Sequence, residues 1–164
     1  ASEGGHACFA PTDPVEDEVL RIMRRRYGRV SIERLICGPG LLNLHRALAE
    51  IDGRDSHIDD PAAITEAALA DPHSPCGATL TRFCAILGSV AGDIALTIGA
   101  RGGVFIAGGI APRILPFLKV SPFRERFEHK GRFQDYMAAI PTRVIMHKHA
   151  ALLGAGRVAF ADPG

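Results

Sequence analysis

The sequence predicts an α/β fold in which many helices surround a short and incomplete sheet. Helical patterns recur along the whole chain, whereas only three segments have the pattern of strands, and two of these look completely buried. A sheet usually contains about 4–6 strands, and a buried strand needs a neighbour at each edge. We therefore expect residues outside this sequence to complete the sheet.

Length and composition are those of one globular domain, or of one lobe of a larger protein. The chain has 164 residues, of which 47% are apolar and 23% charged, and its formal net charge is +1. This charge lacks the basic excess of proteins that bind nucleic acid. No uninterrupted apolar run reaches the ~18 residues of a membrane span. We expect neither a nucleic-acid nor a membrane partner.

The cysteines indicate a reducing compartment. They form no CxxC pair and lie in apolar surroundings, in contrast to the dense disulfide framework of many secreted chains. The first six residues have neither the basic start nor the apolar core of a signal peptide. We therefore predict a cytoplasmic protein with reduced, mostly buried thiols. The cysteines are Cys8, Cys37, Cys76 and Cys84.

The N-terminal half contains well-punctuated helices. Asp13 is suited to an N-cap, Pro14 to the first helical position and Glu16 to a capping box, so a helix is expected from there to Gly28. Residues 30–37 have the pattern of a short strand that leads into a sharp Gly-Pro-Gly turn. Further helices are predicted over 41–51, over 62–70 behind a second Asp-Pro start, and over 79–98.

Small residues in the helix predicted over 79–98 would allow another element to pack closely against it. Ala85, Gly88, Ala91, Gly92 and Ala95 would allow another element to reach its backbone. The rest of the chain alternates between short strands and helices. Strands are predicted over 104–107 and 142–147, and helices over 112–118, 123–127, 133–138 and 150–161.

Four places could carry chemistry. One is Glu33, which could equally be a surface acid paired with Arg34 or with a helix end, and spacing does not connect it with Glu3. Glu3 and His6 flank two glycines, and a carboxylate beside an imidazole offers acceptors and a donor to a ligand with many hydroxyls. Gly108 and Gly109 follow a strand and precede a helix, where open α/β sheets bind ligands. His147 and His149 could bind a metal, but the sequence supplies no third ligand, so we predict no metal site.

Taken together, the segments resemble the C-terminal half of the bacterial glucokinase family, within the sugar kinase, actin and heat-shock chaperone superfamily. The resemblance covers nearly the whole chain. It runs in order through residues 2–6 (SEGGH), Glu33, 37–44 (CGPGLLNL), 65–68, 102–113 (GGVFIAGGIAPR), 127–133 and 152–156. The zinc-binding CxCG cluster of a related group is absent after His6, which favours the glucokinase branch.

The resemblance implies a fold and a division of labour. The fold would be ribonuclease H-like, of the actin-like ATPase kind, with residues 1–164 as the C-terminal (large) lobe. The N-terminal lobe, with the phosphate loops and the catalytic aspartate, is absent from this chain, so we expect no catalytic residue here. Glu3, His6 and Glu33 would bind D-glucose. Gly108 and Gly109 would receive the adenosine of ATP, which brings Mg²⁺ with it.

The function expected on this basis is transfer of the ATP γ-phosphate to glucose, a step of glycolysis, by the complete protein. The chain alone is expected to be inactive. A non-catalytic sugar-binding or regulatory module, and a structural module that has lost the site, are the alternatives. Another hexose as substrate and a homodimeric state, frequent in this family, stay open.

Overall fold

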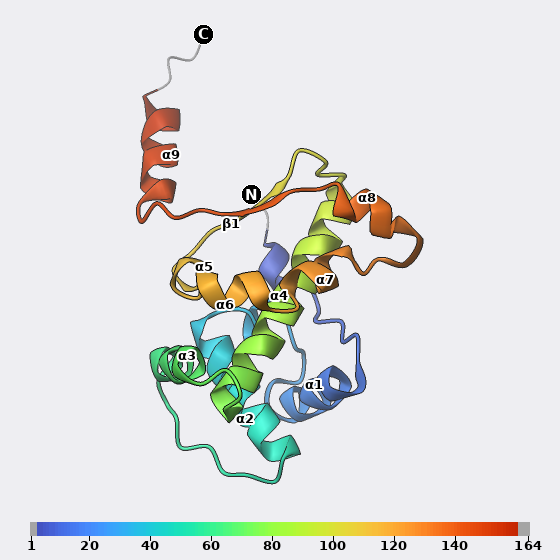
Figure 1. Cartoon of the computed structure of the whole chain (residues 1–164), viewed down its shortest axis with the longest axis vertical. Helices are drawn as coiled ribbons and strands as arrows, with labels where there is room; N and C mark the ends of the chain where they lie inside the picture. Colours follow the sequence, from blue (N-terminus) through green and yellow to red (C-terminus); the bar gives the residue numbers. More distant parts are fainter. Residues whose placement is uncertain (1–2, 161–164) are drawn as a thin grey trace.

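A long helix, α4 (Pro75–Ile98), runs through the middle of the molecule and packs against three other helices (Figure 1). The computed structural model describes residues 3–160. Ser2 and Ala161, to which the expected first motif and last helix extend, lie outside them. The three helices that pack against α4 belong to both halves of the chain: α2 (Gly38–Ile51), α3 (Pro61–Ala70) and α7 (Phe123–Glu128). Helix α1 (Pro14–Tyr27) packs against α2.

Local capping signals set the beginnings of these helices. The side chain of Asp13 accepts a hydrogen bond from the N–H of Glu16 at the start of α1, and Asp60 accepts one from Ala62 at the start of α3. Both starts were predicted from the Asp-Pro pairs, and both are confirmed. Such caps depend only on residues within one turn, so they are visible in sequence.

The small residues of α4 let α7 approach its backbone. A Cβ atom added to Gly88 would lie 2.1 Å from the carbonyl oxygen of Phe123, and one added to Gly92 would lie 2.5 Å from that of Phe127. The predicted close approach is therefore confirmed at these two positions. By length and composition α4 could cross a membrane, but half of its apolar window is buried inside this fold, as in a core helix.

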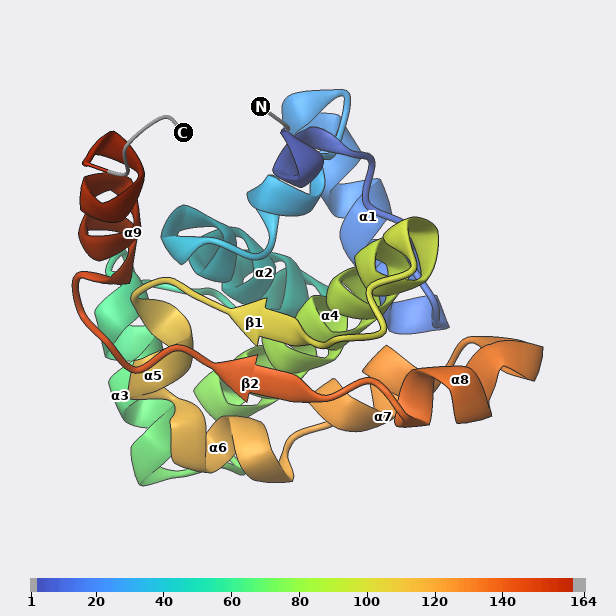
Figure 2. The ribbon, with the colours of Figure 1, turned by 90° about the horizontal axis from the view of Figure 1, so that it is seen from above.

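Two parallel strands form the sheet, β1 (Val104–Ile106) and β2 (Thr142–Val144) (Figure 2). Val104 lies opposite Thr142, and both strands fall where the sequence predicts them, although each is shorter than expected. Their burial differs from the prediction, because the side chain of Phe105 is 61% exposed. On that face the guanidinium of Arg143, from β2, lies 5.8 Å from the centre of the Phe105 ring.

The prediction of a strand over 30–37 is wrong. These residues form only a single antiparallel bridge, from Ser31 to Cys8, followed by the 3-10 turn η2 (Ile32–Arg34). The Gly-Pro-Gly segment is the first turn of α2 and not a loop. The sulfur of Cys37 accepts a hydrogen bond from the N–H of Gly40 at 3.3 Å and so caps the helix.

The C-terminal third consists of short elements. The helix predicted over 112–118 is divided at Ile114, where the backbone leaves helical geometry. The elements in this part are α5 (Ile110–Arg113), α6 (Leu115–Val120), α7, η3 (Gly131–Phe133), α8 (Gln134–Ala138) and α9 (Ala150–Ala159). Helix α9 stands clear of the other helices at the end of the segment that follows β2 (Figure 1).

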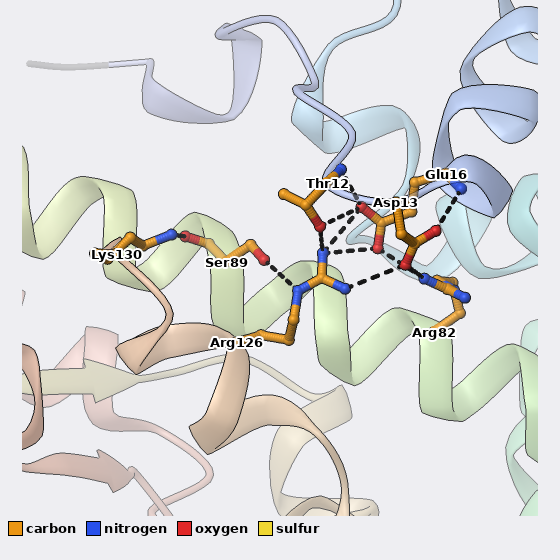
Figure 3. A network of polar contacts seen from close by, with 7 residues as sticks. All are labelled: Thr12, Asp13, Glu16, Arg82, Ser89, Arg126 and Lys130. Carbon is orange, nitrogen blue, oxygen red and sulfur yellow. Dashed lines mark hydrogen bonds and ion pairs between the residues drawn. The ribbon is translucent and has the colours of Figure 1, made fainter. Parts of the chain in front are cut away.

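A buried ionic clasp joins α1, α4 and α7 (Figure 3). Glu16 has no exposed surface, and its carboxylate accepts hydrogen bonds from Arg126 at 2.8 and 2.9 Å and from Arg82 at 3.0 Å. It also accepts from the N–H of Thr12, and not from the N-cap residue as in a capping box. Burial opposes ionisation of Asp13, but the N–H of Glu16 and the guanidinium of Arg82 outweigh it and lower its pKa.

The thiols are less uniformly buried than expected. Cys76 and Cys84 are buried in the core, and burial raises the pKa of Cys84 to about 11. Cys8 is exposed and Cys37 is half-buried, because both lie at the edge of the N-terminal turns. All four are free thiols.

A buried histidine links α2 to α4. Nδ1 of His45 lies 2.8 Å from the hydroxyl oxygen of Thr79, and the side chain is buried. Burial first, and the charges of Arg54 and Arg46 next, lower the pKa of His45 from its ordinary value of 6.5. The folded state therefore favours the neutral imidazole.

We expect this histidine to make stability depend on pH. Because the unfolded chain binds the proton more readily, its contribution is complete above the unfolded pKa and is lost as the pH falls below it. The urea concentration at the unfolding midpoint should fall as the pH is lowered from 7 to 5. In His45→Gln this decrease should be smaller. An unchanged slope in His45→Gln would contradict this role.

Candidate functional site

Two short turns from different parts of the chain form the candidate site. The N-terminal turn η1 (Gly4–His6) is carried by a segment that hydrogen-bonds with the segment before η2. The N–H of Ile32 donates to the oxygen of Ala7 at 2.9 Å, and that of Phe9 donates to Val30 at 3.0 Å. A Cβ atom on Gly5 would lie 3.6 Å from that of Glu33, so the two turns face each other directly.

The structure brings Glu3, His6 and Glu33 together. Nδ1 of His6 lies 3.6 Å from Oε2 of Glu3, and its Nε2 lies 3.5 Å from Oε2 of Glu33. These distances are longer than hydrogen bonds, and all three side chains are more than half exposed. The imidazole thus stands between two carboxylates that remain open to a ligand.

A hollow of about 340 Å³ lies beside this group, a volume within the usual range of small-molecule sites. His6 and Glu33 line it, whereas Glu3 does not line it and lies next to His6. The sequence did not single out the other lining residues, which all lie within residues 29–43, on either side of Glu33. They are Arg29, Ser31, Arg34, Cys37, Pro39, Gly40 and Asn43.

Two arginines and one glutamate line the hollow, together with His6. Arg29 donates to the backbone oxygen of His6, and the guanidinium of Arg34 lies over the ring of Tyr27, 4.4 Å from its centre. The lining therefore offers guanidinium and hydroxyl donors as well as carboxylate and amide acceptors.

The glycine pair lies elsewhere, between β1 and α5. Gly108 has a positive φ of 113°, a conformation that favours glycine, and both glycines are exposed. A second hollow, of about 240 Å³, begins at the next residue, Ile110. Its other lining residues are Gly38, Leu41, Asp60, Pro61, Ala62, Thr65 and Arg113.

The first turn of α2 separates the two hollows. Gly38 lines the second hollow, while Pro39 and Gly40 line the first. Two ligands could therefore lie on either side of one helix start.

The histidines considered for a metal lie after β2. The N–H of His149 donates to Nδ1 of His147 at 3.1 Å. No group of three metal-ligating side chains occurs within residues 3–160.

Comparisons with known proteins agree on one family. The family model described as Glucokinase matches residues 1–161. The glucokinase of Caulobacter sp. (strain K31) is 58% identical over 156 residues, which are 94% of this chain and 46% of that protein. The chain thus spans about half the length of the curated relatives that it matches.

Solved structures agree as well. A crystal structure of glucokinase from an Antarctic psychrotroph superposes with a TM-score of 0.89 at 38% identity, over 96% of this chain and 49% of that one. The glucokinase of Balamuthia mandrillaris, solved in complex with glucose, shares the fold with a TM-score of 0.71 at 15% identity, over 88% of this chain and 43% of that one.

Fold and site thus define a class: a helix-rich part of an actin-like ATPase fold, built around a two-stranded parallel sheet. Within this class, the chain belongs to the glucokinase family. The family membership expected from the sequence is therefore confirmed.

Proposed function

We propose that the complete protein transfers the γ-phosphate of ATP to the 6-hydroxyl of D-glucose, as a cytoplasmic enzyme of glycolysis. In this proposal residues 1–164 form its C-terminal, large lobe. The observation that carries it is the position of His6 between Glu3 and Glu33, beside a hollow that His6 and Glu33 line, in a chain of this family.

The sugar would lie in the first hollow. Ionised Glu3 and Glu33 accept hydrogen bonds, and His6 offers one donor and one acceptor, so neighbouring hydroxyls of the ring each find a partner. Because these residues touch hydroxyls and not the moving phosphoryl group, their role is to hold the ring in place. Phosphoryl transfer depends largely on such positioning.

The nucleotide would lie on the other side of the first turn of α2. Adenosine would contact Gly108 and Gly109 and extend towards the second hollow at Ile110. Mg²⁺ would be held mainly by nucleotide phosphates and water. The metal would neutralise charge on those phosphates.

A second lobe would supply the phosphate loops and the catalytic aspartate, which takes the proton of the 6-hydroxyl. Two exposed apolar surfaces support this division. Phe105 on β1 is open to solvent, and helix α9 has no buried residue of its own. The exposed apolar side chains of α9 are Leu152, Leu153 and Val158. The relatives, about twice as long, have the chain length to cover both surfaces.

An assay for glucose 6-phosphate tests this function. Residues 1–164 are joined to the N-terminal half of the Caulobacter sp. (strain K31) relative, and we call this product the fusion enzyme. It should turn over at ~1–100 s⁻¹, the range of kinases. The chain alone should produce none, because it lacks the catalytic base.

Two results would contradict the proposal. Turnover by the isolated chain would show that the second lobe is not needed. A folded fusion enzyme that binds glucose without phosphorylating it would favour a sugar-binding or regulatory module. The unaltered Caulobacter enzyme is the positive control, and a thermal melt of the fusion enzyme checks that it is folded.

A further inference from the structure

A buried side-chain amide on α2 holds η2, the turn that carries Glu33. Asn43, on α2, is 7% exposed. Its Nδ2 donates to the backbone oxygen of Arg34 at 3.0 Å, and its Oδ1 accepts from the hydroxyl of Tyr27 at 2.9 Å. The backbone oxygen of Arg34 can only accept, so the amide presents its donor side to the turn, while the hydroxyl of Tyr27 donates to its acceptor side.

Two further contacts hold the same turn. The guanidinium of Arg34 lies over the ring of Tyr27, so that α1 contacts the turn through a side chain as well. The thiol of Cys37 donates to the backbone oxygen of Glu33 at 2.9 Å. The backbone of η2 is thus fixed on the protein side, while the carboxylate of Glu33 stays open towards the hollow.

We propose that Asn43 and Tyr27 are positioning residues for Glu33, a role that rests on the proposed function. A three-residue turn has little internal structure to fix a side chain. A binding group held in its productive place avoids the loss of freedom that ligand binding otherwise causes. The hydrogen bond from Asn43 supplies that restraint, and Tyr27 orients Asn43.

Asn43→Leu in the fusion enzyme tests this role. Leucine has a similar volume and removes both hydrogen bonds without adding a charge. The loss of one buried hydrogen bond that positions Glu33 should raise KM for glucose about tenfold. The kcat should change by less than about twofold, because uniform binding of the sugar is lost and not transition-state stabilisation.

A double-mutant cycle separates positioning from general damage. In a Glu33→Ala background there is no carboxylate to place, so Asn43→Leu should raise KM by less than about twofold further. Thr79→Val is the matched control. It removes another buried hydrogen bond between α2 and a neighbouring helix, that with His45, and should lower the melting temperature without changing KM.

Equal rises of KM in both backgrounds, or an unchanged KM in Asn43→Leu, would overturn the proposal. If Asn43→Leu does not fold, Tyr27→Phe gives the same test, since it removes only the hydroxyl and should raise KM about threefold with the same dependence on Glu33. Absence of glucose turnover in the unaltered fusion enzyme would overturn the proposed function and, with it, this role.

Discussion

Replacement of Glu16 by alanine is expected to lower the free energy of unfolding by about 3–5 kcal/mol, the usual cost of breaking a buried ion pair. The carboxylate is wholly buried and lies between the guanidinium groups of Arg82 and Arg126. Without it, Asp13 would be the one carboxylate left to both cations among the described residues. Since a domain is typically stable by only about 5–15 kcal/mol, the variant should be marginally folded.

Urea unfolding of the isolated chain measures this loss, with Glu18→Ala as the control. Glu18 lies on the same helix and forms an ion pair with Arg21, but that pair is exposed to solvent. Exposed pairs contribute little, so the control should unfold almost as the unaltered chain does. Similar losses in the two variants would show that the clasp between α1, α4 and α7 has no special role.

The second large effect is expected at the sugar site. Glu33→Gln in the fusion enzyme should raise KM for glucose roughly ten- to a hundredfold, because a charged hydrogen bond to a ligand contributes about 1.5–3 kcal/mol. Glutamine keeps the shape of the side chain but loses the charge that makes it a strong acceptor. Steady-state kinetics with varied glucose measures the change.

Glu18→Gln is again a suitable control, because it makes the same chemical change on an exposed glutamate that lines no hollow described above. The two variants should have similar melting temperatures. A KM for Glu33→Gln equal to that of the control would mean that the carboxylate does not touch the sugar. A large fall in kcat with unchanged KM would assign Glu33 a chemical role in place of a positioning one.

The sequence allowed the prediction of features that depend on neighbouring residues. The helix starts at Asp13 and Asp60 were predicted because a cap and the proline after it act within one turn. The same use of local pattern gave a wrong prediction for residues 30–37. Its apolar pattern fits a strand, and cysteine is not among the usual N-cap residues, so Cys37 gave no sign that α2 begins at Gly38.

Features that depend on distant residues could not be predicted in this way. Local spacing explained Glu16 as part of a capping box, whereas its partner Arg126 is 110 residues away. At the site, Glu3 and His6 are neighbours on one turn and could be paired from spacing. Only the resemblance to a family connected Glu33 with them, and the bridge between Cys8 and Ser31 is what brings it there.

In the proposed complex, Glu3, His6 and Glu33 bind one sugar between two turns of the chain. A crystal structure of the fusion enzyme with bound glucose shows whether they do. We expect the ring in the hollow next to His6, with its hydroxyls within hydrogen-bond distance of both carboxylates. Glucose ordered at another place, with these three side chains free of it, would contradict the claim.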